Sequence, residues 1–421
     1  MNWNLKELVK HLVGERKCLY FKGLIELTLK MKYKMKGYYK CNTDCVNSIV
    51  EYGQEGYDTF CGYYDYFPLS KDGQYLLCQR VKCGSNTAHD CTEIGYYMIK
   101  SGRFEFLTKS SAWNWQQGSR LHWSNVEENV IFYNDIDNSN YCTKVFDVLE
   151  RKVKRIISPA LYDISKSEKI GASVNFARLQ RLRPGYGYSK IEDDTFSMNA
   201  PQDDGLLLVD IRTGEKSLAV SLQRLASDVD EQFLHQHYIN HVSFSPSDDK
   251  IMFFHIWTDD KWPGWMTRLC IYYVSSGRLQ ILESEKLVSH YCWMDDNTLL
   301  ITGADKQTKE AFYRVYDVNG KYTQLDKTVL NNDGHPTYDE SRRYIISDTY
   351  PNEKSIQKVF LYSFNHSLRT NLLDVFSDPR LAREYRCDLH PKCKDNIIVI
   401  DSTYKNCSRN ILLLSLNDTI R

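Results

Sequence analysis

The 421-residue sequence has no excess of charge of either sign, because Lys and Arg together number 54 and Asp and Glu also number 54. A chain without net charge offers no general electrostatic attraction for nucleic acid. No run of about 18 apolar residues occurs, so we expect no membrane-spanning helix. The first residues lack an uninterrupted apolar core and a small-residue cleavage site, so no signal peptide is expected either. These absences predict a cytoplasmic protein.

Several local motifs of common enzyme classes are also missing. There is no Gly-x-Ser-x-Gly elbow of a serine hydrolase, no phosphate-binding loop and no dinucleotide-binding glycine motif. The 13 cysteines include no Cys-x-x-Cys pair. An odd number of cysteines without a repeated spacing is typical of free thiols in a reducing compartment.

Aromatic residues are abundant, with 30 Tyr, 17 Phe and 8 Trp. They favour strands over helices and also suit clefts in which sugar rings stack. From about residue 56 the chain repeats a plan of four short strands joined by tight turns. In the clearest unit we predict strands at His241–Ser245, Lys250–Ile256, Thr267–Val274 and Arg278–Leu282. In the third unit we expect Val174–Leu179 to form a strand.

Four short strands in each repeat of about 40–50 residues are typical of β-propeller blades. Seven such units predict an all-β fold, a seven-bladed β-propeller over residues 51–421 with a basic N-terminal arm at residues 1–50. Residues 1–40 contain nine Lys and one Arg against three Glu, a net charge of +7. The arm could contact an anionic membrane surface, which would make the protein membrane-peripheral, or it could be a solvated extension packed on the main domain. We favour the second interpretation.

Four histidines stand at the same point of four consecutive units: His241, His290, His335 and His390. The first strand of each propeller blade lines the central channel, so residues just before it should converge on the axis. A single histidine is more commonly structural. Four at one repeat position favour a metal or proton-transfer site.

A second set of residues interleaves aromatic, Arg and amide side chains near the same face. Aromatic rings stack on sugar faces and Arg makes two-pronged contacts with carboxylates, so this set suits a polyanionic sugar. Trp113 could instead only cap the stack of blades. The set comprises Trp113, Gln117, Arg120, Arg178 and Arg183.

The histidine segments resemble the oligogalacturonate lyases, which are seven-bladed propellers, and the TolB-like propellers related to them. The chain departs from the lyase pattern where Asp388 stands in place of a ligand histidine, so we identify it as a divergent branch. The resemblance is carried by Asn240-His241, Phe253-Phe254-His255, Arg268, Ser289–Trp293, Gly334-His335 and Asp388–Pro391.

The resemblance implies that His290 is the base, that Arg268 binds the substrate carboxylate, and that His335 and His390 bind a divalent metal, typically Mn²⁺. Asp388 would complete a set of ligands that suits such an ion.

We further expect a tyrosine near the axis, Tyr291 or Tyr64, to protonate the leaving oxygen, and His241 and His255 to contact substrate. These roles predict a metal-assisted lyase that acts by β-elimination on an acidic, uronate-containing oligosaccharide. The alternative is a non-catalytic propeller that binds a glycan or a protein partner in surface-polysaccharide assembly.

Overall fold

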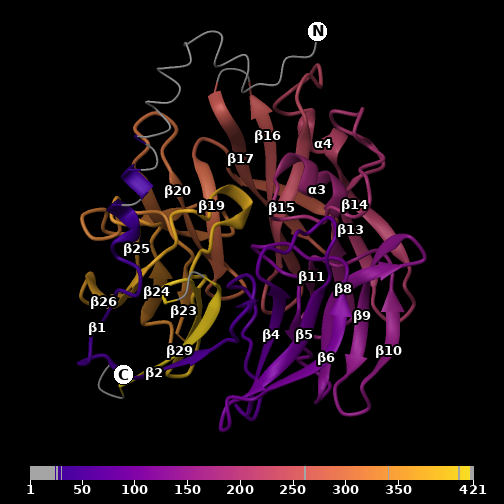
Figure 1. The fold of residues 1–421 in the computed structure, drawn as a ribbon. Helices are drawn as coiled ribbons and strands as arrows, with labels where there is room; N and C mark the ends of the chain where they lie inside the picture. The colour runs from indigo at the N-terminus through magenta and orange to yellow at the C-terminus, as the bar shows by residue number, and fades with distance from the viewer. Residues whose placement is uncertain are drawn as a thin grey trace.

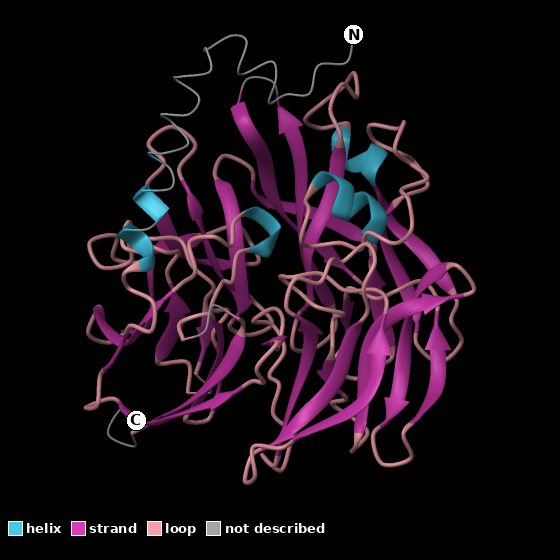
Figure 2. Cartoon of the chain, in the orientation of Figure 1, coloured by secondary structure: helices cyan, strands magenta, loops and turns pink. Residues whose placement is uncertain are grey.

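Seven antiparallel sheets make up the computed structural model, which describes residues 24, 27–29, 31–259, 262–339, 341–405 and 408–417. The chain runs through the sheets in order, as the colours of Figure 1 show. Strands form most of the regular structure, and the few helices are short (Figure 2). The predicted all-β, seven-bladed β-propeller is confirmed. Residues 1–23 of the predicted arm lie outside the described residues.

Each of the first five blades is built from four consecutive strands. Blade 1 consists of β3 (Tyr57–Phe60), β4 (Tyr75–Lys82), β5 (Thr92–Met98) and β6 (Phe104–Ser110), and blade 2 of β7 (His122–Trp123), β8 (Val130–Asp137), β9 (Asn140–Asp147) and β10 (Lys152–Ile157). Blade 3 consists of β11 (Asp163–Ile164), β12 (Ile170–Ser173), β13 (Gly205–Asp210) and β14 (Lys216–Ser221), and blade 4 of β15 (His237–Phe244), β16 (Lys250–Asp259), β17 (Trp262–Tyr273) and β18 (Arg278–Glu283). Blade 5 consists of β19 (Leu287–Trp293), β20 (Thr298–Ala304), β21 (Ala311–Asp317) and β22 (Tyr322–Gln324).

The last two blades take strands from both ends of the chain. Blade 6 consists of β23 (Thr337–Tyr338), β24 (Tyr344–Asp348), β25 (Ile356–Ser363), β26 (Leu368–Phe376) and β1 (Tyr39–Cys41). Blade 7 consists of β27 (Lys392–Lys394), β28 (Ile397–Ser402), β29 (Asn410–Leu416) and β2 (Val46–Tyr52). Because β2 pairs along β29, the start of the chain completes the blade made by its end and closes the ring. The expected boundary at residue 50 falls inside β2.

The blades are buried on both faces, which explains the continuous apolar runs of the inner strands. In β20, Leu299, Leu300 and Ile301 are all fully buried. Successive side chains of a strand point to opposite faces, and Leu300 belongs to a different core cluster from its two neighbours. Each sheet is therefore packed between two others.

One predicted strand is wrong. Val174–Leu179 does not form a strand, because the segment enters helix α3 (Phe176–Leu182). The Asn175 side chain accepts a hydrogen bond from the Arg178 backbone N–H, an arrangement that caps a helix N-terminus. Two other short helices lie in loops, α4 (Leu222–Ala226) and η1 (Arg383–Tyr385). In the described part of the chain, no helix has the length and apolar composition needed to cross a membrane.

Candidate metal centre

The structure brings the four predicted histidines together from four blades. The ring centres of His290 and His335 are 4.1 Å apart, those of His335 and His390 are 4.4 Å apart, and those of His241 and His290 are 6.1 Å apart. All four side chains are buried, with at most 5% of the residue exposed. The imidazoles are therefore almost fully covered, and the neighbouring side chains of Asp333 and Arg386 reach the surface.

Local backbone irregularities aim these side chains at one another. His335 and His390 lie just before β23 and β27, as the sequence predicts. His241 and His290 lie instead inside β15 and β19, where the strand register shifts. A bulge of this kind turns a side chain away from the regular alternation of the strand, so all four imidazoles reach the same place.

His335, Asp388 and His390 form a group that could bind a metal ion, since one ligand atom from each lies within 4.8 Å of the others. Asp348 lies 2.9 Å from Nδ1 of His335, which leaves Nε2 as the available ligand atom. The Nε2 atoms of both histidines are buried and have no hydrogen-bond partner. A buried polar atom without a partner is costly, and a shared cation would satisfy both atoms.

Two of the three proposed ligands, His390 and Asp388, have the protonation state that metal binding needs. Burial and the neighbouring His335 lower the pKa of His390 well below its usual value, so this imidazole is neutral, as a ligand must be. Burial acts to raise the pKa of Asp388, but Arg386 outweighs it and the pKa is lowered. Arg386 Nε and Nη2 donate to the two oxygens of Asp388 at 2.6 and 2.7 Å. The carboxylate is therefore ionised. For His335, burial acts to lower the pKa, but the neighbouring Asp348 outweighs it and the pKa is raised, so a metal would have to displace a proton from this imidazole.

His290 stands beside this group with a carboxylate behind it. Its Nδ1 lies 3.3 Å from Oδ1 of Asp333, and the second carboxylate oxygen accepts a hydrogen bond from Ser289 Oγ at 2.6 Å. An ionised carboxylate at Nδ1 favours the proton on that nitrogen and leaves the Nε2 lone pair free. Burial and the nearby His335 lower the pKa of His290. His290 can therefore accept a proton at Nε2.

Two adjacent tyrosines from the loop between β3 and β4 pack under the imidazoles. Tyr63 Oη lies 3.2 Å from Nδ1 of His241. Tyr64 Oη donates to the Tyr291 carbonyl at 2.8 Å and accepts from the Tyr291 N–H at 2.9 Å. The Tyr291 hydroxyl is buried without a hydrogen-bond partner, and no described contact joins it to His290.

Arg268 and His255 lie apart from the histidine cluster. Arg268 Nε donates to Nδ1 of His255 at 3.0 Å, and its Nη2 donates to the Leu225 carbonyl of α4. The preceding residue, Thr267, faces Val288 of the next blade instead. Because adjacent residues of a strand face opposite sides, Arg268 points away from blade 5 and from His290. The structure does not bring Arg268 or His255 to the metal centre.

Three of the remaining predicted residues bond to other parts of the propeller: Trp113 to a loop of blade 1, and Gln117 and Arg120 to Tyr162 at the start of blade 3. Trp113 Nε1 donates to the Asp90 carbonyl. Gln117 Nε2 donates to Tyr162 Oη at 2.5 Å, and Arg120 Nε donates to the Tyr162 carbonyl at 2.7 Å. All three side chains are buried, and none of their described contacts is with a histidine of the cluster.

The two arginines of the third blade differ in position. Arg178 is buried in α3 and donates to backbone carbonyls of His237 and Asn199, each at 2.7 Å. Arg183 is partly exposed, with its guanidinium 4.1 Å from the Trp265 ring centre. It also lies over Tyr186, whose ring centre is 5.7 Å from that of His241. Of the two, only Arg183 approaches the cluster.

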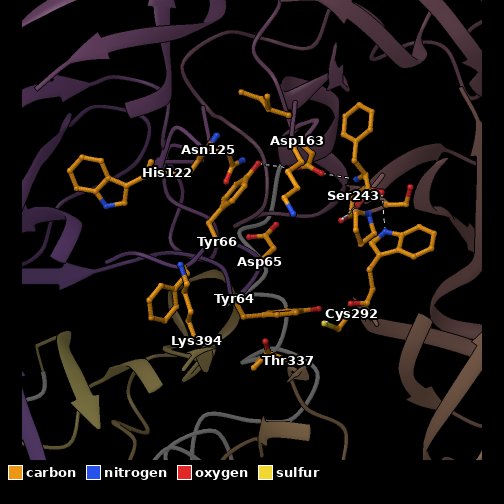
Figure 3. A pocket seen from close by; sticks show the side chains of 18 of the residues that line it. Tyr64, Asp65, Tyr66, His122, Asn125, Asp163, Ser243, Cys292, Thr337 and Lys394 are labelled. Atoms are coloured by element: carbon orange, nitrogen blue, oxygen red, sulfur yellow. Dashed lines mark hydrogen bonds between the residues drawn. The ribbon is translucent and has the colours of Figure 1, made fainter. Parts of the chain in front are cut away.

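A cavity of about 600 Å³ lies toward the other end of the channel. Figure 3 shows residues that line it, among them Tyr64, Asp163 and Lys394. It is lined by the C-terminal ends of β15, β19 and β27, the strands that contain or follow His241, His290 and His390, including Phe244, Trp293 and Lys394. Asp163 in its wall accepts hydrogen bonds from Tyr66 Oη and the Phe244 N–H. Burial raises the pKa of Asp163 to about 6, although Arg120 opposes the shift. No sequence motif indicated this cavity.

Four residues around the histidines were not predicted from the sequence: Asp333, Asp348, Tyr350 and Arg386. A period of two could have found two of them. Asp333 lies two residues before His335, and Arg386 lies two residues before Asp388, so an extended chain places each pair on one side. Tyr350 follows Asp348 at the same spacing, but nothing in the sequence marks Asp348 itself.

Comparison with known proteins gives a likeness of fold. No protein-family model matches the chain, and no curated protein matches it by sequence. The crystal structure of an oligogalacturonate lyase from Vibrio parahaemolyticus is 12% identical, with a TM-score of 0.63 over 91% of this chain and 98% of the other. A structure of oligogalacturonate lyase in complex with manganese is 13% identical, with a TM-score of 0.59 over 91% and 99%. The resemblance inferred from the motifs is thus confirmed for the fold: the chain is a seven-bladed propeller similar to those of the two oligogalacturonate lyase structures.

Proposed function

We propose that this protein is a metal-dependent lyase that cleaves a uronate-containing oligosaccharide by β-elimination. The observation that carries the proposal is the pair of buried, unpartnered Nε2 atoms of His335 and His390 beside the ionised Asp388. His290 adds a proton acceptor at ring contact with His335. The likeness to a lyase structure in complex with manganese supports this function.

The donor set fits Mn²⁺ or a similar divalent ion, because it combines two imidazole nitrogens with a carboxylate oxygen. When bound, such an ion would neutralise the uronate carboxylate and so make the proton on the adjacent carbon more acidic. Asp348 fixes the tautomer of His335 for this purpose.

The protein groups on the open side of the cluster would bind and deprotonate the substrate. The side chains of Arg386 and Asp333 are 33% and 23% exposed, whereas the imidazole of His290 is 4% exposed. A substrate would therefore approach past Arg386, which can pair with the uronate carboxylate. We assign to Arg386 the role that the sequence suggested for Arg268. His290 Nε2, backed by Asp333, would then take the proton from the carbon next to the carboxylate.

The test begins with metal content and product absorbance. Purified protein should retain about one Mn²⁺ per chain and should convert a uronate oligosaccharide to an unsaturated product that absorbs in the ultraviolet. His335→Gln should lose both the metal and the product. The matched control, His366→Gln, alters an exposed histidine and should change neither. A wild-type protein that binds no divalent metal would overturn the proposal.

A second candidate is non-catalytic binding of a glycan, which the cavity at the other end of the channel favours. Its walls combine the rings of Tyr66 and Trp293 with the charged groups of Asp65 and Lys394, a mixture that suits sugar rings and hydroxyls. In that case calorimetry should detect glycan binding without turnover. Lys394→Ala should weaken the binding and His335→Gln should not, whereas the lyase proposal expects the reverse.

A further inference from the structure

Tyr350 presents its hydroxyl to the proposed base. Its Oη lies 3.5 Å from Nε2 of His290, the nitrogen opposite to the one that faces Asp333. The Tyr350 ring also packs edge-on against His335, with ring centres 5.7 Å apart. On another side the guanidinium of Arg386 lies 4.6 Å from the ring centre. These contacts hold the phenol beside the base and next to the proposed carboxylate-binding cation.

The phenol is in its protonated form. A tyrosine hydroxyl keeps its proton at neutral pH, because its ordinary pKa is about 10. Tyr350 is partly exposed, so a substrate can reach it. It can therefore donate a proton to an oxygen placed beside it.

Of the two tyrosines expected for this role, Tyr64 has its hydroxyl occupied, and the hydroxyl of Tyr291 has no described contact with His290. The Tyr64 hydroxyl is bonded to both backbone groups of Tyr291. The Tyr291 side chain lines the cavity at the far end of the channel. Among the described residues, Tyr350 is the tyrosine whose hydroxyl lies within 3.5 Å of a nitrogen of His290.

We propose that His290 and Tyr350 act as base and acid on the same face of the sugar ring, and that the substrate is therefore a gluco- or manno-configured uronate. This inference rests on the proposed lyase function. It adds both the proton donor and the stereochemical class of the substrate.

The short distance between the two groups decides the stereochemistry. A base and an acid must each lie within hydrogen-bond reach of the atoms they serve. In a galacto-configured uronate the C5–H and C4–O bonds point to opposite faces, so the ring would have to lie between the two groups. In gluco- and manno-configured uronates these bonds lie on the same side, and adjacent groups can serve both. The separation of paired catalytic groups predicts the stereochemical course in glycoside hydrolysis in a similar way.

The proton transfers between the substrate, His290 and Tyr350 balance. His290 Nε2 takes the proton from C5, the electron pair of that bond forms the C4–C5 double bond, and the C4–O bond breaks. The leaving oxygen takes the proton of Tyr350 Oη and becomes a hydroxyl. The phenolate then takes the proton from Nε2 of His290, which restores both groups without an oxidant or another reactant.

The first test compares uronates that differ in configuration. Oligosaccharides of equal length that contain glucuronate, mannuronate or galacturonate are incubated with the Mn²⁺-loaded protein, and the unsaturated product is followed by ultraviolet absorbance. We expect kcat/KM to be at least about 100-fold higher for the gluco or manno series than for the galacto series. Preference for galacturonate would overturn this inference and leave the lyase function intact. No product from any series would overturn both.

The second test isolates the proton donor. Tyr350→Phe should lower kcat by about 100-fold or more, with KM, metal content and thermal stability unchanged. A uronate with fluoride at C4 needs no acid, so this variant should process it at nearly the wild-type rate, whereas His290→Gln should not. The control Tyr39→Phe alters an exposed hydroxyl at the outer edge of blade 6 and should behave as wild type. Equal loss of activity on both substrates in Tyr350→Phe would show that Tyr350 is not the acid.

Discussion

Asp348 accepts two hydrogen bonds from His335, one from the backbone N–H at 2.8 Å and one from the imidazole Nδ1–H at 2.9 Å. Its other oxygen accepts a hydrogen bond from the backbone N–H of His390 at 3.2 Å. A single buried carboxylate at the end of β24 thus orients two proposed metal ligands from neighbouring blades. Such outer partners fix the tautomer and direction of a ligating imidazole.

We therefore expect Asp348→Asn to weaken Mn²⁺ binding by about 10–100-fold, because the amide has only one oxygen to accept the hydrogen bonds of His335 and His390. Calorimetric titration of the metal-free protein measures the change. Asp210→Asn, which alters an exposed turn, serves as the control. Unchanged affinity in Asp348→Asn would mean that the imidazoles do not depend on this carboxylate.

Arg386→Gln should separate substrate binding from metal binding. The change removes the cation paired with Asp388, so the carboxylate should attract a divalent ion at least as well as before. Loss of a charge-assisted bond to the uronate should raise KM by roughly 10–100-fold. Steady-state kinetics and metal titration on the same sample measure the two effects. A fall in metal affinity with unchanged KM would contradict this role.

Arg268→Lys should lower the stability of the protein and leave metal and substrate binding unchanged. Lysine cannot donate to both His255 and the Leu225 carbonyl as the guanidinium does. We expect a loss of about 2–4 kcal/mol in the free energy of unfolding, because buried polar groups lose their partners. Metal affinity and KM should stay at wild-type values. Chemical denaturation gives the first quantity, and a raised KM in folded protein would restore the role suggested by the resemblance.

Acid should destabilise the protein through the histidine pair beside Arg268. His237 lies between His255, at 2.9 Å, and Asp230, at 3.2 Å. Burial lowers the pKa of His237 to about 4, whereas the unfolded value is about 6.5. The unfolded chain therefore binds more protons between these values, and stability is complete above about pH 6.5 and is lost as the pH falls toward about 4.

The matched variant is His237→Gln, which keeps an acceptor for His255 and a donor for Asp230 but does not titrate. Between pH 7 and pH 5 its free energy of unfolding should fall by about 2 kcal/mol less than that of the wild type. Denaturation at both pH values tests this expectation. Equal losses in the two proteins would place the acid sensitivity elsewhere.

The residues at the histidine cluster show how much of the site can be predicted from local sequence. The spacing of His335 and His390 from the strands that follow them was sufficient to place both at the channel, because blades repeat their geometry. Arg268 was taken from a resemblance of motifs, which does not fix the direction of its side chain, because one residue along a strand reverses that direction. A motif can match in sequence while its side chain points into another blade interface.

The sequence by itself determined the propeller and the meeting of the histidines, since repeated strand lengths, turns and apolar runs specify blades, and blades share one axis. Only the tertiary structure decided which partners those histidines acquire. Asp348 and Tyr350 come from segments up to 60 residues away from the imidazoles they contact, and their contacts depend on bulges and loop paths between blades. The tertiary structure also decided how the ring of blades closes, because the pairing of β2 with β29 joins residues more than 350 positions apart.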